Sequence, residues 1–224
     1  MQFPENLINK ITNSGVIAVL VIEDVQTAVP VAKALIAGGI SAIELTLRTK
    51  AAIDCLKIIK AEVPELAIGV GTVLTCQQVD EITEIGVNFG VSPGLNPKVV
   101  ERAQENDLPF VPGIMTPSEI ECSIQLGCRV LKFFPAESSG GIKHLKSMKA
   151  PYEHRGVKFI PLGGINIDNM TAYLSEDNII AVGGSWIAKP AIIKNKLWDE
   201  IKSNALATKN VVAKLRRYGE TRVR

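Results

Sequence analysis

The sequence of 224 residues has few of the side chains on which metal sites, disulfide scaffolds and hydrolytic triads depend. Its two histidines, His144 and His154, stand in no HExxH pattern and beside no plausible nucleophile, so zinc hydrolysis and a Ser-His-Asp triad have no support. The four cysteines form no CxxC pair (Cys55, Cys76, Cys122 and Cys128). We therefore expect reduced thiols and neither a metal nor another cofactor.

Long apolar runs and a strong charge bias are also missing. The longest apolar run near the start, residues 16–22, is too short to cross a bilayer and lacks the basic flank and cleavage site of a signal peptide. The formal charge is only +2, although basic residues gather between Lys209 and Arg224. No aromatic interleaving supports nucleic-acid binding there, and we interpret the segment as a solvated helix face and tail. We expect a cytoplasmic protein that binds neither nucleic acid nor a membrane.

Aromatic residues make up only 5 % of the chain, whereas small and β-branched apolar residues are plentiful, which suits strands packed under helices. Eight short apolar runs alternate with stretches of helical periodicity. The runs cover residues 16–22, 42–45, 67–72, 88–91, 109–112, 129–133, 157–162 and 179–183. This repeat predicts an α/β fold, a single (β/α)8 TIM barrel domain over residues 1–224. An open doubly wound sheet is the alternative, but no G-x-G-x-x-G follows the first run.

Two helical segments lie outside the repeat. Apolar residues at helical spacing predict an N-terminal helix at about residues 4–14, which Gly15 ends. A C-terminal helical extension is expected at about residues 190–224, as one long helix or two shorter ones.

A lysine lies inside a short apolar run that ends at a proline, from Val130 to Pro135. The alternation of a strand places Val130, Lys132 and Phe134 on one face. Burial of an unpaired ammonium group is costly and favours the neutral amine, which is a nucleophile. On this stretch alone, a snorkelling lysine or a structural ion pair is the alternative explanation.

Other polar residues near strand ends are expected at the same rim, because a barrel builds its active site from the carboxyl ends of its strands. Glu44 lies near the end of the second run and is expected to meet Lys132 there. If the strand stays extended, alternation places Arg48 on the side of Glu44, and Thr72 ends the third run. Because a guanidinium group can bind a carboxylate through two hydrogen bonds, these residues predict a site for a small keto acid.

Glycine pairs follow the last two runs, at Gly163-Gly164 and at Gly183-Gly184 before Ser185. Backbone N–H groups exposed at glycines can bind a phosphate, and a helix N-terminus adds partial positive charge. Barrels often bind phosphate after strands seven and eight. We expect a phosphate site here, with Ser185 as a hydroxyl donor. Ordinary loop chemistry is the alternative.

Six segments together resemble a known family, class I 2-keto-3-deoxy-6-phosphogluconate (KDPG) aldolase, whose bifunctional members also act on 4-hydroxy-2-oxoglutarate (KHG). The segments are Glu44-Leu45-Thr46-Leu47-Arg48-Thr49, Gly69-Val70-Gly71-Thr72-Val73-Leu74, Ser92-Pro93-Gly94-Leu95, Pro112-Gly113-Ile114, Lys132-Phe133-Phe134-Pro135-Ala136-Glu137 and Gly183-Gly184-Ser185-Trp186. The similarity runs over about residues 16–186, in the same order and with similar spacing. One departure is Leu162, where many members carry a threonine before the paired glycines.

The resemblance implies a homotrimeric barrel lyase that cleaves a phosphorylated keto acid to pyruvate and glyceraldehyde 3-phosphate. It also implies roles for individual residues. Lys132 is the Schiff-base lysine and Glu44 the general acid and base; Arg48 and Thr72 hold the substrate carboxylate; Phe134 and Pro93 line the pocket; and Gly163, Gly164, Gly184 and Ser185 surround the phosphate. A phosphate-binding barrel isomerase or epimerase, and a non-catalytic sugar-phosphate-binding barrel, remain as alternatives that form no trappable lysine adduct.

Overall fold

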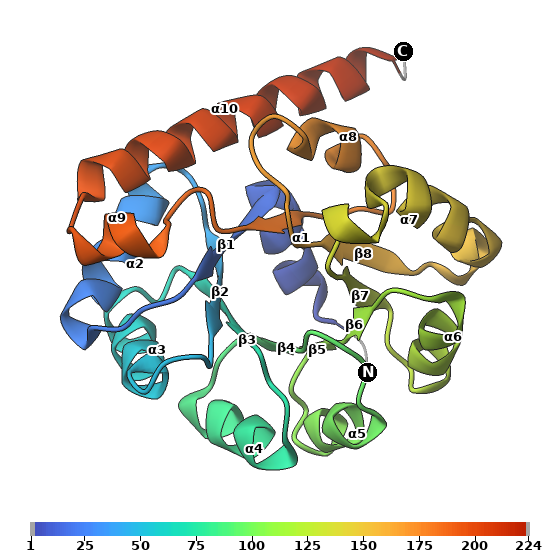
Figure 1. Ribbon diagram of the computed structural model, residues 1–224, viewed down its shortest axis with the longest axis horizontal. Coiled ribbons are helices and arrows are strands. Elements are labelled where there is room, and N and C mark those ends of the chain that lie inside the picture. Colours follow the sequence, from blue (N-terminus) through green and yellow to red (C-terminus); the bar gives the residue numbers. More distant parts are fainter. Residues whose placement is uncertain (1–2, 223–224) are drawn as a thin grey trace.

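Parallel strands form the centre of the molecule and helices surround them (Figure 1). The computed structural model describes the backbone of residues 3–222 and the side chains of residues 3–216. The strands are β1 (Val16–Leu20), β2 (Ala42–Thr46), β3 (Ala67–Gly71), β4 (Phe89–Val91), β5 (Phe110–Val111), β6 (Gly113–Ile114), β7 (Val130–Phe133), β8 (Lys158–Pro161) and β9 (Val182–Gly184). The α-helices are α1 (Glu5–Ser14), α2 (Ala28–Ala37), α3 (Ala52–Glu62), α4 (Cys76–Ile85), α5 (Pro97–Glu105), α6 (Pro117–Gln125), α7 (Gly141–Lys149), α8 (Met170–Leu174), α9 (Pro190–Lys194) and α10 (Trp198–Arg222).

The strands pair in chain order, as strand-helix repeats require. One sheet has the order β5-β4-β3-β2-β1-β9 and the other has the order β6-β7-β8, with every pair parallel. Two isolated parallel bridges, including Leu162 to Gly183, join the segments of β8 and β9. Each of the eight predicted runs contains a strand. The α/β architecture with parallel strands is therefore confirmed.

The region of the fifth predicted run differs, because two very short strands lie on either side of Pro112: β5 within the predicted run and β6 directly beyond its end. Proline has no N–H to contribute to a ladder, so a continuous strand is interrupted there. The carbonyl of Pro112 still accepts a hydrogen bond from the backbone N–H of Lys132 (2.9 Å). The interruption leaves the neighbouring strand β7 in place.

The strands bury both faces, and the two faces belong to two apolar clusters. Ile43 and Leu45 of β2 pack with the helices, whereas Ala42 belongs to an inner cluster. Leu7 and Ile11 of α1 join that inner cluster, and Gly15 leads from α1 directly into β1. The predicted N-terminal helix is thereby confirmed. It covers the amino ends of the strands, which leaves the carboxyl ends for a site.

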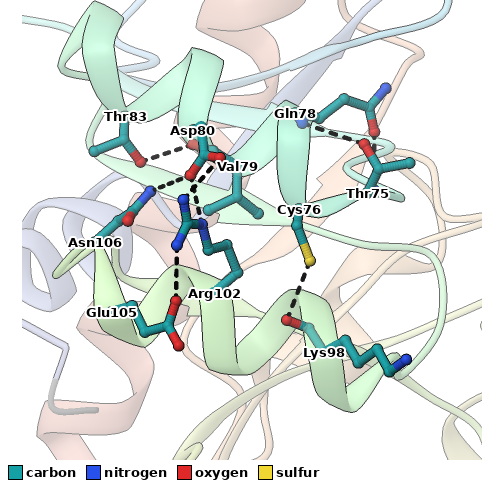
Figure 2. A network of polar contacts seen from close by, with 10 residues as sticks. All are labelled: Thr75, Cys76, Gln78, Val79, Asp80, Thr83, Lys98, Arg102, Glu105 and Asn106. Atoms are coloured by element: carbon teal, nitrogen blue, oxygen red, sulfur yellow. Dashed lines mark hydrogen bonds and ion pairs between the residues drawn. The ribbon is translucent and has the colours of Figure 1, made fainter.

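Sequence-local signals explain where several surrounding helices begin and how two of them are joined. Thr75 begins α4 with a capping box that Gln78 completes. Figure 2 shows the polar network between α4 and α5, in which Arg102 donates to both carboxylate oxygens of Asp80 (2.7 and 3.0 Å) and also to Glu105 (2.9 Å). The hydrogen bond from Arg102 holds the pKa of Asp80 below its usual range. All three charged groups are partly exposed to solvent, so the network contributes little to the free energy of unfolding.

The C-terminal extension forms the short α9 followed by one long helix, α10, which packs against α2, α8 and α9 along the edge of the molecule (Figure 1). Of the two predicted forms, one long helix is therefore correct. The basic side chains beyond residue 216 lie outside the described side chains. Within the described residues, no helix is both long and apolar enough to cross a membrane.

Candidate active site

Lys132 and Glu44 meet between the strands, as the sequence predicts. The Nζ atom of Lys132 lies 3.0 Å from Oε1 of Glu44, and the two side chains are 6 % and 3 % exposed. The buried ammonium group therefore has a charged partner, which offsets the cost of its burial. A carboxylate at hydrogen-bond distance is also a group that can accept a proton from the lysine.

Gly71 of β3 makes room for the carboxylate of Glu44. A Cβ atom at Gly71 would lie 2.2 Å from Oε1 of Glu44 and 2.8 Å from its Cδ. The register pairs Gly71 with Thr46, so the glycine stands beside the carboxyl end of β2. Only a residue without a side chain leaves Glu44 in its position against Lys132.

Phe134 follows β7 and places its ring beside the lysine. The Nζ atom of Lys132 lies 5.0 Å from the ring centroid, within the range of a cation–π contact. Pro93, in the loop after β4, lines the same space. The amine is thus surrounded by one carboxylate and by apolar surface.

Arg48 reaches the site by a route that differs from the expected one. β2 ends at Thr46, so the extended geometry does not continue to Arg48, whose backbone N–H instead bonds to the carbonyl of Thr46 (2.9 Å). Its Nε donates to Oγ1 of Thr46 (3.2 Å), and that hydroxyl donates to the carbonyl of Leu20 (3.1 Å). Thr46 therefore orients the guanidinium group, whose remaining donors are available to a carboxylate.

Thr72 lies one residue beyond the end of β3 in a left-handed conformation, with φ of 63°. This conformation is rare for a β-branched residue and costs roughly 1–3 kcal/mol. Such strain is often kept where a side chain must face a ligand. Thr72 lines the same pocket as Arg48.

The glycine loops after β8 and β9 offer free donors. Among the described residues, the backbone N–H groups of Gly163, Gly164 and Ser185 donate no hydrogen bond within the chain. The expected helix N-termini are a different matter, because α8 begins at Met170 and α9 at Pro190, and each has only five residues. Neither helix begins directly at a glycine pair, although the side chain of Asn166 caps the turn that leads into α8 by accepting from the backbone N–H of Asp168 (2.8 Å). The backbone N–H groups and the Ser185 hydroxyl are therefore the nearest groups that could bind an anion.

Glu137 and Tyr173 support the loop after β8 from outside the pocket. A Cβ atom at Gly164 would lie 2.6 Å from Cβ of Glu137, and the backbone N–H of Glu137 bonds to the carbonyl of Gly163 (3.0 Å). The hydroxyl of Tyr173 in α8 donates to Oε1 of Glu137. Burial, together with this bond to a carboxylate, raises the pKa of Tyr173. The tyrosine therefore stays protonated and acts as the donor.

One pocket of about 220 Å³ brings together the groups that the sequence predicts for the site. All ten residues predicted for the site line it: Glu44, Arg48, Thr72, Pro93, Lys132, Phe134, Gly163, Gly164, Gly184 and Ser185. The pocket also contains five residues without a predicted role: Val19, Thr46, Leu162, Ile165 and Gly183. Of these five residues, Thr46 could have been found from the sequence, because it lies two residues after Glu44 on the same strand and therefore faces the same side. Among the side chains of residues 3–216, no three His, Cys, Asp or Glu groups lie together as a metal ion requires.

Comparison with known proteins shows which family this chain resembles. The model of the family described as KDPG and KHG aldolase matches residues 7–204. The KHG/KDPG aldolase of Escherichia coli is 41 % identical over 191 residues, which are 85 % of this chain and 89 % of that protein. The 2-dehydro-3-deoxy-phosphogluconate aldolase of Dickeya dadantii is 40 % identical over 195 residues, 87 % of this chain and 91 % of that protein.

Solved structures agree with the sequence comparison. A KDPG aldolase from Legionella pneumophila, with pyruvate captured as a covalent carbinolamine intermediate, superimposes with a TM-score of 0.86 at 38 % identity, over 90 % of this chain and 97 % of that one. The aldolase of Zymomonas mobilis with 3-phosphoglycerate gives a TM-score of 0.81 at 38 % identity, over 90 % of this chain and 94 % of that one. The chain described here belongs to the KDPG and KHG aldolase family.

Proposed function

We propose that this protein is a class I aldolase that cleaves KDPG to pyruvate and glyceraldehyde 3-phosphate. The observation that carries the proposal is the buried amine of Lys132, 3.0 Å from Glu44, in a pocket with anion-binding groups at both ends. The relatives that hold a pyruvate carbinolamine and 3-phosphoglycerate support a substrate with a keto acid end and a phosphate end.

In the proposed reaction, Glu44 accepts a proton from Lys132, and the neutral amine attacks the C2 ketone to form a carbinolamine. Protonated Glu44 gives this proton to the carbinolamine hydroxyl, which leaves as water, so that an iminium forms and the carboxylate of Glu44 is restored. Glu44, directly or through a water molecule, removes the proton of the C4 hydroxyl, and the electrons of the C3–C4 bond move into the iminium as the aldehyde leaves. Glu44 delivers the proton taken from the C4 hydroxyl to C3 of the remaining enamine, and water then hydrolyses the resulting iminium to release pyruvate and restore Lys132.

Each end of the pocket has its own task in this proposal. Arg48 and Thr72 bind the carboxylate and set the ketone opposite Lys132. Gly163, Gly164, Gly184 and Ser185 bind the phosphate, so that binding energy far from the reacting bond positions C4 beside Glu44. Phe134 and Pro93 line the pocket beside the reacting carbon atoms.

KHG, which has no phosphate, is a second proposed substrate because the matching family includes KHG aldolases. Leu162 is buried in the pocket wall where many family members have a threonine, so it offers no hydroxyl to the middle of a polyhydroxylated substrate. We therefore expect the ratio of activity on KHG to activity on KDPG to be higher in this protein than in a variant with threonine at position 162.

We also propose that the two sheets close into one (β/α)8 barrel domain over residues 1–224. The bond from Lys132 N–H to the Pro112 carbonyl and the bridge from Leu162 to Gly183 support closure at both sheet edges. The family resemblance supports a homotrimer, which sedimentation of the purified protein tests. The four cysteines are all free, which supports a place in the cytoplasm.

Pyruvate release tests the proposed function, with lactate dehydrogenase as the coupling enzyme and KDPG, its galactonate epimer and KHG as substrates. We expect the highest kcat/KM for KDPG or KHG, and no pyruvate from Lys132→Ala with any of them. An isomerase or a binding protein would release no pyruvate from any substrate, and that result would overturn the proposal.

A further inference from the structure

Trp186 occupies the space behind Gly184, on the side of β9 away from the pocket. A Cβ atom at Gly184 would lie 1.6 Å from Cζ3 and 2.0 Å from Cε3 of the indole ring. The neighbouring Gly183 faces the other way, since its Cβ would meet Leu162 in the pocket wall. The indole therefore lies directly against the backbone that carries Gly184 and Ser185, and its position limits where that backbone can lie.

The indole is in turn held by the C-terminal helix. Its Nε1 donates to Oγ1 of Thr208 in α10 (3.2 Å), and Thr208 is fully buried. Asn204, four residues earlier and on the same face of α10, donates to the carbonyl of Ile187 (3.3 Å). Two consecutive turns of α10 thus hold the segment that follows the glycine loop.

The helix that provides these contacts is itself firmly placed. Ala205 packs so closely on Gly38, at the end of α2, that a Cβ there would lie 2.3 Å from the methyl group of Ala205. Val212 packs in the same way on Gly15, between α1 and β1. Close contacts of this kind transmit a displacement instead of absorbing it.

We propose that Trp186 and Thr208 are positioning residues for the phosphate end of the pocket, and that α10 holds Gly184 and Ser185 in the conformation that binds the phosphate. This inference rests on the proposed function. The carboxylate end is built separately, since Arg48 is oriented by Thr46 and by the carbonyl of Leu20. Loss of the Trp186–Thr208 bond therefore weakens binding of the phosphate and leaves binding of pyruvate unchanged.

The test is Thr208→Val, which keeps the shape of the side chain and removes the acceptor. A buried N–H without a partner is costly, so the indole shifts to find one and the loop moves with it. We expect the KM for KDPG and the inhibition constant of inorganic phosphate to rise about two- to tenfold, the effect of one buried hydrogen bond. The kcat/KM for KHG and the yield of borohydride-trapped pyruvate should stay at the parent values.

Two further variants serve as controls. Thr208→Ser keeps the acceptor and should restore the parent KM for KDPG, whereas Ser203→Ala removes an exposed hydroxyl from the same helix and should have no effect. Equal losses with KDPG and KHG in Thr208→Val, or an unchanged KM for KDPG, would overturn the positioning role. If the parent protein releases no pyruvate from either substrate, the proposed function fails instead, so the two failures are distinguishable.

Discussion

Replacement of Gly71 by alanine should disable Glu44, although the substitution changes neither Glu44 nor Lys132 itself. The new Cβ atom would lie 2.2 Å from Oε1 of Glu44, far inside a normal contact. Because the new Cβ atom would overlap Oε1, the carboxylate of Glu44 has to shift by about 1 Å to reach a normal contact distance, and a misplacement of this size costs about 100-fold in rate. We therefore expect kcat for KDPG to fall about 100-fold. Overpacking should also lower the free energy of unfolding by about 1–3 kcal/mol.

Pyruvate release measures the rate, and thermal unfolding followed by circular dichroism measures the stability. Gly94→Ala is the matched control, since a Cβ at Gly94 meets nothing within 4 Å. The cause is tested in a Glu44→Ala background, where the clashing atoms are absent and Gly71→Ala should cost almost nothing more. An unchanged kcat in Gly71→Ala, or the same proportional loss in both backgrounds, would refute the placement of Glu44 as the group that Gly71 accommodates.

Three other changes have distinct expected results. Lys132→Arg should abolish pyruvate release as fully as Lys132→Ala, because a guanidinium group stays protonated; residual turnover above that of the alanine variant would contradict this. Arg48→Lys should raise the KM for KDPG and for KHG alike by about tenfold through loss of the planar fork, and an effect on KDPG alone would contradict a role at the carboxylate. Glu176→Gln should make the free energy of unfolding less dependent on pH in the acid range. Contacts from Lys146 and Lys149 lower the pKa of Glu176. The carboxylate therefore stabilises the fold above the ordinary pKa of a glutamate, and this stabilisation is lost as the pH falls through the lowered pKa. Urea unfolding of the parent protein and of Glu176→Gln at pH 7 and at acidic pH measures this difference, and an equal loss of stability in both proteins on acidification would contradict the prediction.

The alternation of strand residues was sufficient to predict the central pair. Glu44 and Lys132 are 88 residues apart in sequence, yet each lies near the end of an apolar run that strand geometry directs inward. Parallel pairing of neighbouring strands then brings their carboxyl ends to the same side of the molecule, which is why all the predicted residues line one pocket. These properties depend on local periodicity and on general rules of strand connection.

Features that depend on particular tertiary contacts were not predictable in the same way. Arg48 was expected on an extended strand, but the chain turns after Thr46, and a side-chain hydrogen bond brings the guanidinium group to the pocket. The glycine loops were expected at helix N-termini, whereas both following helices are short and begin later. The contact of Trp186 with Thr208 requires α10 to pack on α2, which no local pattern in either segment indicates.

Trapping of pyruvate on the protein tests the central claim most directly. The protein is treated with pyruvate and sodium borohydride, digested, and mapped by mass spectrometry. A covalent mechanism through Lys132 predicts a reduced three-carbon adduct on the peptide that contains Lys132, with loss of activity in proportion to labelling and no adduct in Lys132→Ala. An active protein that gains no adduct, or that gains it on another lysine, would contradict the account.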